Sequence, residues 1–70
     1  MRLSTRNQLS GTVTEVNLGS VMATVKVRLD GGGQIVTASI TKEAAEELGL
    51  AADSAVTVFV KSTEVMLGVE

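Results

Sequence analysis

Residues 21–29 read Val-Met-Ala-Thr-Val-Lys-Val-Arg-Leu, in which apolar residues at the odd positions alternate with mostly polar residues at the even ones. Successive side chains of a β-strand point to opposite faces, so this alternation places the apolar set on one face. A strand that is buried on one face and wetted on the other is typical of antiparallel sheets. Residues 21–29 therefore predict a half-buried strand of a small antiparallel sheet.

The segments on either side predict further strands joined by turns. Residues 9–16 alternate too, with a change of phase at positions 14 and 15 that indicates a β-bulge. Residues 17–20 (NLGS) form the turn that leads into residues 21–29. Residues 30–33 (DGGG) predict a hairpin turn, because no strand-loop-helix context or GxxxxGK motif supports a phosphate-binding loop. A third strand follows at residues 34–40.

Residues 42–48 predict one short helix. Thr41 can cap it by accepting a hydrogen bond from a free N–H group of the first turn. Gly49 suits the left-handed position that ends many helices. The expected buried stripe comprises Ala44, Ala45 and Leu48. The carboxylates of Glu43 and Glu47 share a face, but two exposed glutamates supply too few ligands for a hard cation, so we interpret them as solvated.

Two more alternating segments, residues 55–60 and about 64–69, predict strands after the helix. The expected order is β-β-β-α-β-β. Five antiparallel strands with one helix between the third and the fourth match an OB-type barrel. We therefore expect residues 1–70 to form a single all-β domain with a small α content.

The composition limits how the fold can be stabilised and which reactions the side chains can catalyse. A chain of 70 residues buries only about 60% of its unfolded surface. Without Cys or His it lacks disulfides, the usual zinc ligands, a thiol nucleophile and an imidazole base, so we do not expect an enzyme. Self-association remains as a source of stability. The outward positions Met22, Ile35, Phe59 and Met66 are apolar, which fits burial between subunits or, alternatively, scattered surface residues.

Charge and hydropathy exclude two classes of partner. The net charge is −2 and one residue is aromatic, whereas nucleic-acid binders usually combine a basic surface with stacking aromatics. No apolar run approaches the roughly 20 residues that a membrane helix needs, and no signal-peptide pattern is present. The sequence therefore predicts a cytoplasmic protein with no nucleic-acid or membrane partner.

Three polar groups suggest a site for a small anion. Ser4, Thr5 and Arg6 precede the first strand, and Lys61 and Ser62 follow the strand at residues 55–60. The start of the helix adds a hydroxyl group and free N–H groups at the positive end of the helix dipole. A frayed terminus, a surface lysine and a helix cap would explain the same residues without a ligand. The groups can surround one anion only if the barrel or a second subunit brings them together.

At these residues the chain resembles the molbindins, the Mop-type molybdate-binding domains of the TOBE group. The resemblance rests on residues 4–9 (STRNQL), 11–13 (GTV), 19–23 (GSVMA), 37–41 (TASIT), 48–50 (LGL) and 60–63 (VKST). It implies a homohexamer, built as a trimer of dimers, that binds molybdate or tungstate between subunits for molybdenum storage, buffering or delivery. The metal would be held as an oxyanion with no direct ligand and no organic cofactor. The alternative is a structural or regulatory interaction module of OB type with no anion site or a vestigial one.

The resemblance also implies two kinds of oxyanion site. The first would comprise Ser4, Thr5, Arg6, Thr41, Ala44, Lys61 and Ser62. Some relatives have a serine where this chain has Ala44, so only the backbone N–H of Ala44 could serve. The second would lie at the Gly-x-Val turn and comprise Asn17, Gly19, Ser20 and Val21, mostly through backbone donors. Glu43, beside the helix start, would repel a dianion unless it faces away.

Overall fold

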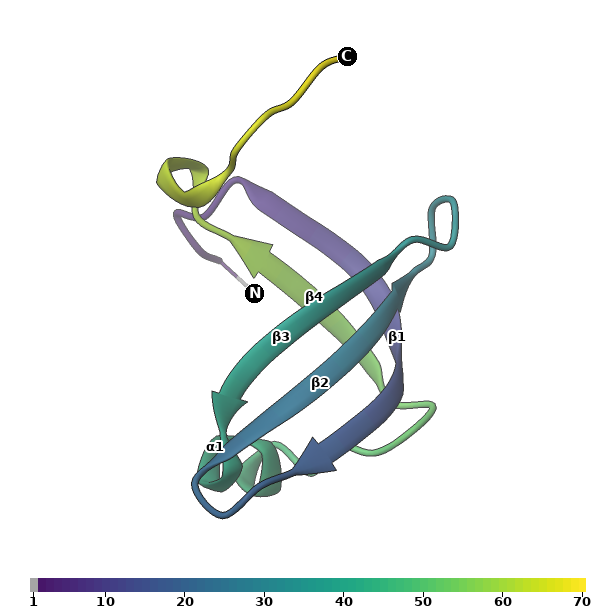
Figure 1. Cartoon of the computed structure of the whole chain (residues 1–70), viewed down its shortest axis with the longest axis vertical. Helices are drawn as coiled ribbons and strands as arrows, with labels where there is room; N and C mark the ends of the chain where they lie inside the picture. Colours follow the sequence, from purple (N-terminus) through teal and green to yellow (C-terminus); the bar gives the residue numbers. More distant parts are fainter. Residues whose placement is uncertain (1) are drawn as a thin grey trace.

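The sheet is built around β1 (Asn7–Leu18), its longest strand. The computed structural model describes residues 2–70, in which β1 lies between β2 (Met22–Leu29) and β4 (Ala55–Val60). The order across the sheet is β3-β2-β1-β4, with β3 (Ile35–Thr41) at one edge and β4 at the other. The short helix α1 (Lys42–Glu47) connects β3 to β4 (Figure 1).

Each half of β1 pairs with a different strand, and all pairs are antiparallel. Its first half pairs with β4, from Asn7 opposite Val60 to Thr12 opposite Ala55. Its second half pairs with β2, and the register shifts between Val13 and Glu15. The bulge predicted at positions 14 and 15 is therefore confirmed. Bulges increase the twist of a strand, and here the sheet curls so that β4 crosses behind β2 and β3 (Figure 1).

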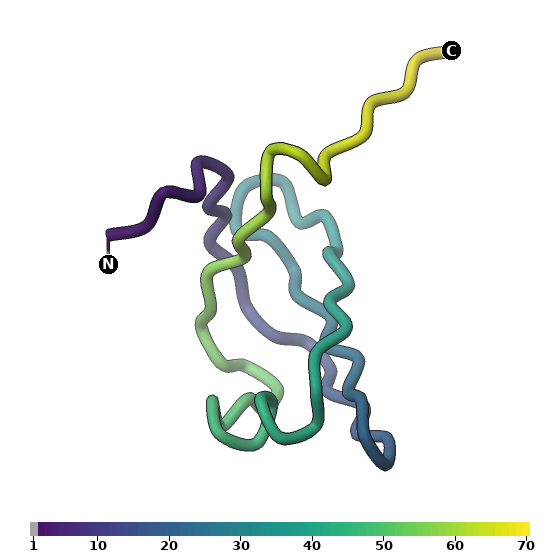
Figure 2. Tube along the Cα trace, turned by 90° about the vertical axis from the view of Figure 1, so that its left-hand side faces the viewer, coloured from purple at the N-terminus to yellow at the C-terminus, as the bar shows by residue number. Residues whose placement is uncertain are grey.

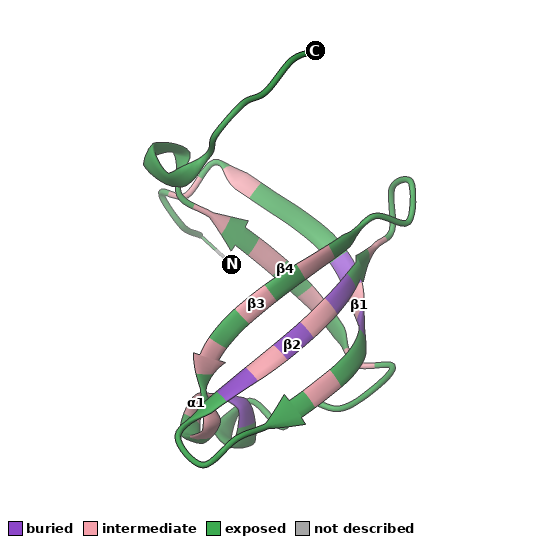
Figure 3. Ribbon diagram, viewed as in Figure 1, coloured by how far each residue is buried: buried purple, intermediate pink, exposed green. Residues whose placement is uncertain are grey.

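The core lies on the concave side of this curled sheet. Val13, Val25 and Val27 are buried, and six partly buried residues pack against them: Val16, Ala38, Ile40, Leu50, Val56 and Val58 (Figure 3). The alternation predicted for residues 21–29 is confirmed from Ala23 onward. Val21 departs from it and is 69% exposed, because it precedes β2 in the turn.

Gly11 is buried where β1 pairs with both of its neighbours. A Cβ atom at this position would lie 2.6 Å from Cγ1 of Val27 and 2.8 Å from the carbonyl oxygen of Arg28. Only a residue without a side chain allows the strands to approach this closely.

The ends of α1 agree with the sequence, but its buried face is smaller than predicted. The N–H of Ala44 donates to Oγ1 of Thr41 over 3.0 Å, and Gly49 has a φ of +63°, which confirms both caps. Ala45 is buried, whereas Leu48 is 70% exposed, so the prediction of Leu48 in the buried stripe is wrong. The helix ends at Glu47 and the chain turns, which places Leu50 against the core in its place.

The described chain has four strands where the sequence predicted five. Ser62–Glu64 form a 3₁₀ helix, η1, and residues 65–70 run away from the sheet (Figures 1 and 2). A strand needs a neighbour that takes up its backbone N–H and C=O groups, and the alternation of residues 64–69 does not supply one. The mostly-β character, with one short α-helix, is confirmed.

Candidate functional site

One end of the sheet gathers the basic residues that the sequence singled out. Asn7 and Val60 form the last pair between β1 and β4, and Nδ2 of Asn7 donates to the carbonyl oxygen of Val60 over 3.0 Å. Arg6 directly precedes β1, and Lys61 directly follows β4. The N-terminal segment and the start of η1 therefore lie together at this end (Figure 1).

The terminal cluster, as we call it, comprises Ser4, Thr5, Arg6, Lys61 and Ser62. Its residues are exposed except Thr5, which is half-buried. Nε2 of Gln8 donates to the carbonyl oxygen of Thr5 over 2.7 Å and holds the segment before β1 in place. Two cations and three hydroxyl groups can neutralise a small dianion and donate hydrogen bonds to its oxygens.

A second group of candidate residues lies where the β1–β2 turn meets α1. Thr41 pairs with Met22 across β3 and β2, and the N–H of Lys42 donates to the carbonyl oxygen of Val21 over 2.8 Å. The N–H of Gly19 donates to the carbonyl oxygen of Met22 over 2.7 Å, which fixes the turn. The turn cluster, as we call it, comprises Gly19, Ser20, Val21, Thr41 and Ala44.

Part of the turn cluster lines an open hollow of about 340 Å³. Ser20, Val21 and Thr41 line the hollow, so residues expected in two different sites share it. Lys42, Glu43 and Glu46 also line it, and two carboxylates against one ammonium group disfavour an anion there in a single chain.

Some donors of the turn cluster are already used within the chain. The N–H of Ala44 donates to Oγ1 of Thr41, and the N–H of Lys42 donates to Val21. The hydroxyl of Thr41 keeps its own hydrogen as a donor. The side chain of Asn17 donates to Oε2 of Glu15 and is not among the residues that line the hollow.

The two clusters lie at opposite ends of the sheet. The terminal cluster adjoins the N- and C-terminal segments, and the turn cluster adjoins α1 (Figure 1). The chain measures 37 Å along its longest axis. Because a tetrahedral oxyanion contacts only donors within hydrogen-bonding distance of its oxygens, the two clusters of one chain cannot surround the same ion.

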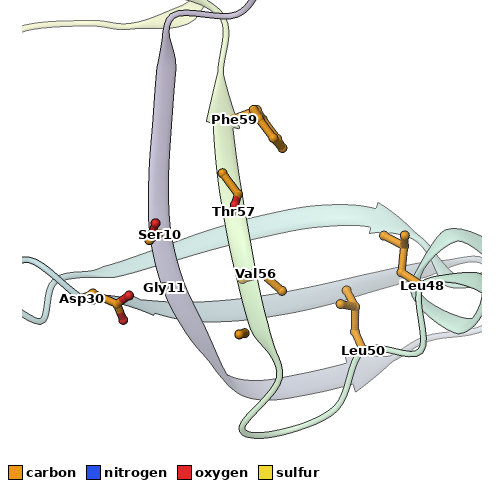
Figure 4. Close-up of a pocket in the computed structure, with 9 residues that line it drawn as sticks. Ser10, Gly11, Asp30, Leu48, Leu50, Val56, Thr57 and Phe59 are labelled. Atoms are coloured by element: carbon orange, nitrogen blue, oxygen red, sulfur yellow. The ribbon is translucent and has the colours of Figure 1, made fainter. Parts of the chain in front are cut away.

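A third feature, not identified from the sequence as a site, is an open apolar groove beside β4. Its walls include Leu48, Leu50, Val56 and Phe59, whose side chains converge on the same space (Figure 4). Ser10 and Asp30 lie at its far rim. Apolar walls and a carboxylate do not suit an oxyanion, so the groove is not part of the anion site. The one sequence signal for it was the outward Phe59.

Two further features are absent from residues 2–70. Within this part of the chain, no group of three or more carboxylate residues is placed to hold a metal ion. The same residues include no helix of the length and hydropathy that crossing a bilayer requires.

The comparisons with known proteins agree on one family. Residues 3–67 match the TOBE domain. The chain is 39% identical over its full length to a probable molybdenum-pterin-binding protein of Haemophilus influenzae, all of which it covers. It is 42% identical to molybdenum-pterin-binding protein 2 of Clostridium pasteurianum, with 96% of this chain and 97% of the relative covered.

Solved structures agree with the sequence comparison. MopII from Clostridium pasteurianum, in an apo form, superposes with a TM-score of 0.91 at 38% identity, with 97% of this chain and all of that chain covered. The cytoplasmic molybdate-binding protein ModG, with molybdate bound, gives a TM-score of 0.92 at 43% identity. This chain is covered completely in that match but spans only 49% of ModG. The chain therefore belongs to the TOBE domain family, and within it to the Mop-type molbindins.

Proposed function

We propose that this protein binds molybdate or tungstate as intact oxyanions between the subunits of a homo-oligomer, and so stores, buffers or delivers molybdenum in the cytoplasm. Its relatives carry names that describe molybdenum-pterin binding or molybdate binding. The observation that carries the proposal is the separation of the terminal cluster from the turn cluster. Each has part of a donor set, and a second copy can supply the other part.

In the first proposed site, the terminal cluster of one copy faces the turn cluster of another. Arg6 and Lys61 neutralise the dianion, and the hydroxyls of Ser4 and Ser62 donate to its oxygens. Charge-assisted hydrogen bonds of this kind are about twice as strong as neutral ones. Thr5 contributes through its backbone.

The second copy contributes through the start of α1. Thr41 donates its hydroxyl hydrogen, and its hydrogen bond with Ala44 fixes the direction in which Oγ1 points. The second proposed site uses the turn of Asn17, Gly19, Ser20 and Val21. Glu43 and Glu46 must turn outward or pair with a cation of the neighbouring copy for either site to hold a dianion.

The assembly we propose is a homohexamer, a trimer of dimers. Large apolar side chains that a small monomer would leave in water support self-association; they include Leu3, Leu9, Met22, Ile35, Leu48 and Phe59. Burial of such residues also supplies stability that a 70-residue core lacks. The protein needs no catalytic residue for this function.

The carboxylates in the hollow favour one alternative, an interaction module of OB type without anion binding. Isothermal titration calorimetry with molybdate, tungstate and sulfate separates the two functions. Our proposal predicts saturable binding of molybdate and tungstate and much weaker binding of the smaller sulfate, because cavity size would set the preference. An oligomer that shows no heat with either metal oxyanion would establish the alternative.

A further inference from the structure

The turn between β2 and β3 joins an exposed aspartate to three exposed glycines, residues 30–33. The carboxylate of Asp30 takes part in none of the side-chain hydrogen bonds within residues 2–70. A Cβ atom at Gly31 would meet nothing within 4 Å, so no neighbouring group crowds this position. The carboxyl group and the peptide nitrogen that follows it are therefore both accessible.

The hydrogen bonds that fix this turn bypass the nitrogen of Gly31. The N–H of Asp30 donates to the carbonyl oxygen of Ser10 over 3.0 Å, and the N–H of Gly33 donates to that of Leu29 over 3.1 Å. Within the described chain, no backbone hydrogen bond uses the N–H of Gly31. A peptide nitrogen attacks a carbonyl carbon only as it loses its proton, and a proton exposed to water is lost more easily than one held by a carbonyl oxygen. Gly31 thus supplies an available nucleophilic nitrogen directly after a carboxyl group.

We propose that Asp30 is a modification site, at which aspartate converts spontaneously to isoaspartate. The nitrogen of Gly31 attacks Cγ of the protonated Asp30 carboxyl group and forms the N–Cγ bond of a five-membered succinimide. The Cγ–OH bond breaks, and the hydroxyl leaves with the proton of the Gly31 nitrogen as water. Water then adds to either carbonyl of the ring. Cleavage of the N–Cγ bond restores aspartate, whereas cleavage of the bond between the nitrogen and the main-chain carbonyl carbon produces isoaspartate. Glycine hinders the attack least because it has no Cβ atom.

The chain contains one other aspartate, Asp53, which provides an internal comparison. Asp53 is exposed as well, and it also lies in a turn. However, the N–H of Ser54 donates to the carbonyl oxygen of Ala51 over 3.1 Å, and the carbonyl oxygen of Ser54 accepts from the N–H of Val13 over 2.9 Å. Ser54 also carries a Cβ atom beside its nitrogen. The same reaction should therefore be much slower at Asp53 than at Asp30, although both residues are exposed.

Isoaspartate would alter the turn at a defined point. The main chain would pass through Cγ and gain one methylene group, about 1.5 Å of chain, between Asp30 and Gly31. The hydrogen bond from Gly33 to Leu29 spans the insertion and should weaken, whereas the bond from Asp30 to Ser10 lies before it and should persist. The modification would thus open the tip of the β2–β3 hairpin and leave its attachment to β1 intact. This inference is independent of oxyanion binding.

Ageing of the wild-type protein tests the proposal. The purified protein is incubated for several weeks at neutral pH, and isoaspartate is then quantified with isoaspartyl methyltransferase and radiolabelled S-adenosylmethionine. Endoproteinase Asp-N, which cuts before aspartate but not before isoaspartate, assigns the position. We expect methyl uptake to rise with time, cleavage before Asp30 to be lost in step, and cleavage before Asp53 to persist. Absence of methyl uptake, or equal loss of cleavage at both positions, would overturn the proposal.

Two variants and a hydrogen-exchange measurement sharpen the test. Gly31→Ala keeps the charge and has room for its methyl group but hinders the attack, so most of the methyl uptake should be lost. Asp30→Glu should lose all of it, because the ring would need six members. In aged wild-type protein, the amide of Gly33 should exchange faster while that of Asp30 stays protected. Methyl uptake at the wild-type rate in Gly31→Ala would place the reactive residue elsewhere, and unchanged exchange at Gly33 would refute the opening of the turn.

Discussion

The side-chain amide of Asn7 donates to the carbonyl oxygen of Val60 over 3.0 Å and closes the last pair between β1 and β4. Arg6 directly precedes Asn7, and Lys61 directly follows Val60. The strand pair therefore holds the backbone of these two cationic residues close together, although 54 residues lie between them in the sequence. A cation pair positioned by a strand ladder is a better anion site than two charges on free termini.

Removal of either cation should weaken molybdate binding. We expect Arg6→Ala and Lys61→Ala each to raise the dissociation constant more than about tenfold, because a hydrogen bond to a charged group contributes about 1.5–3 kcal/mol. Calorimetric titration measures this. Arg28→Ala removes an equal charge from the exposed part of β2 and serves as the control. Near-native affinity in both cluster variants would place the site elsewhere.

The Asn7 hydrogen bond should matter for stability as well as for the site. Asn7→Ala removes the bond to the partly buried Val60 carbonyl, and we expect a loss of about 1 kcal/mol in the free energy of unfolding. Urea denaturation measures the change. Molybdate affinity should fall less than in Arg6→Ala, since the cations remain. If stability is unchanged, the bond does not hold this end of the sheet.

Thr41 should act through its hydroxyl group. Thr41→Ala removes the cap that accepts from Ala44, which costs about 1 kcal/mol, and also removes the proposed hydrogen-bond donor to the oxyanion. Thr41→Ser keeps both functions. Denaturation and calorimetry together should show two losses in the alanine variant and restoration of both in the serine variant. Full affinity in Thr41→Ala would remove Thr41 from the site.

Gly11 should not tolerate a methyl group. A Cβ atom there would lie 2.6 Å from Val27 and 2.8 Å from the backbone of Arg28, so Gly11→Ala should destabilise the fold by about 1–3 kcal/mol. Gly31→Ala, where nothing lies within 4 Å, is the control and should be nearly neutral. Thermal denaturation of the two variants compares them directly. Equal stability would mean that β1 and β2 can separate at this point at little cost.

Local patterns predicted most of the fold because the responsible forces act locally. The alternation in residues 21–29, the bulge near position 14 and the caps at Thr41 and Gly49 depend on neighbours a few residues away. The errors at Leu48 and at residues 65–70 have a different origin. Leu48 is exposed because the chain turns after α1, and residues 65–70 lack a strand partner within their own chain. A local period encodes neither tertiary packing nor the presence of a pairing partner for a strand.

The candidate site shows the same limit. Sequence reasoning identified donors of suitable chemistry, but it did not show that Arg6 and Lys61 flank the same strand pair or that Thr41 lies at the other end of the sheet. These relations follow from the pairing of Asn7 with Val60 and of Met22 with Thr41. A ladder joins residues that are distant in sequence, so only the register reveals which candidates meet.

Native mass spectrometry of the wild-type protein with and without molybdate tests the central claim most directly. If oxyanions are held between subunits, the spectra will show an oligomer that gains whole-number additions of molybdate, while any single chain present gains none. A single chain that binds molybdate by itself, or an oligomer that gains no molybdate at saturating concentration, would contradict the account.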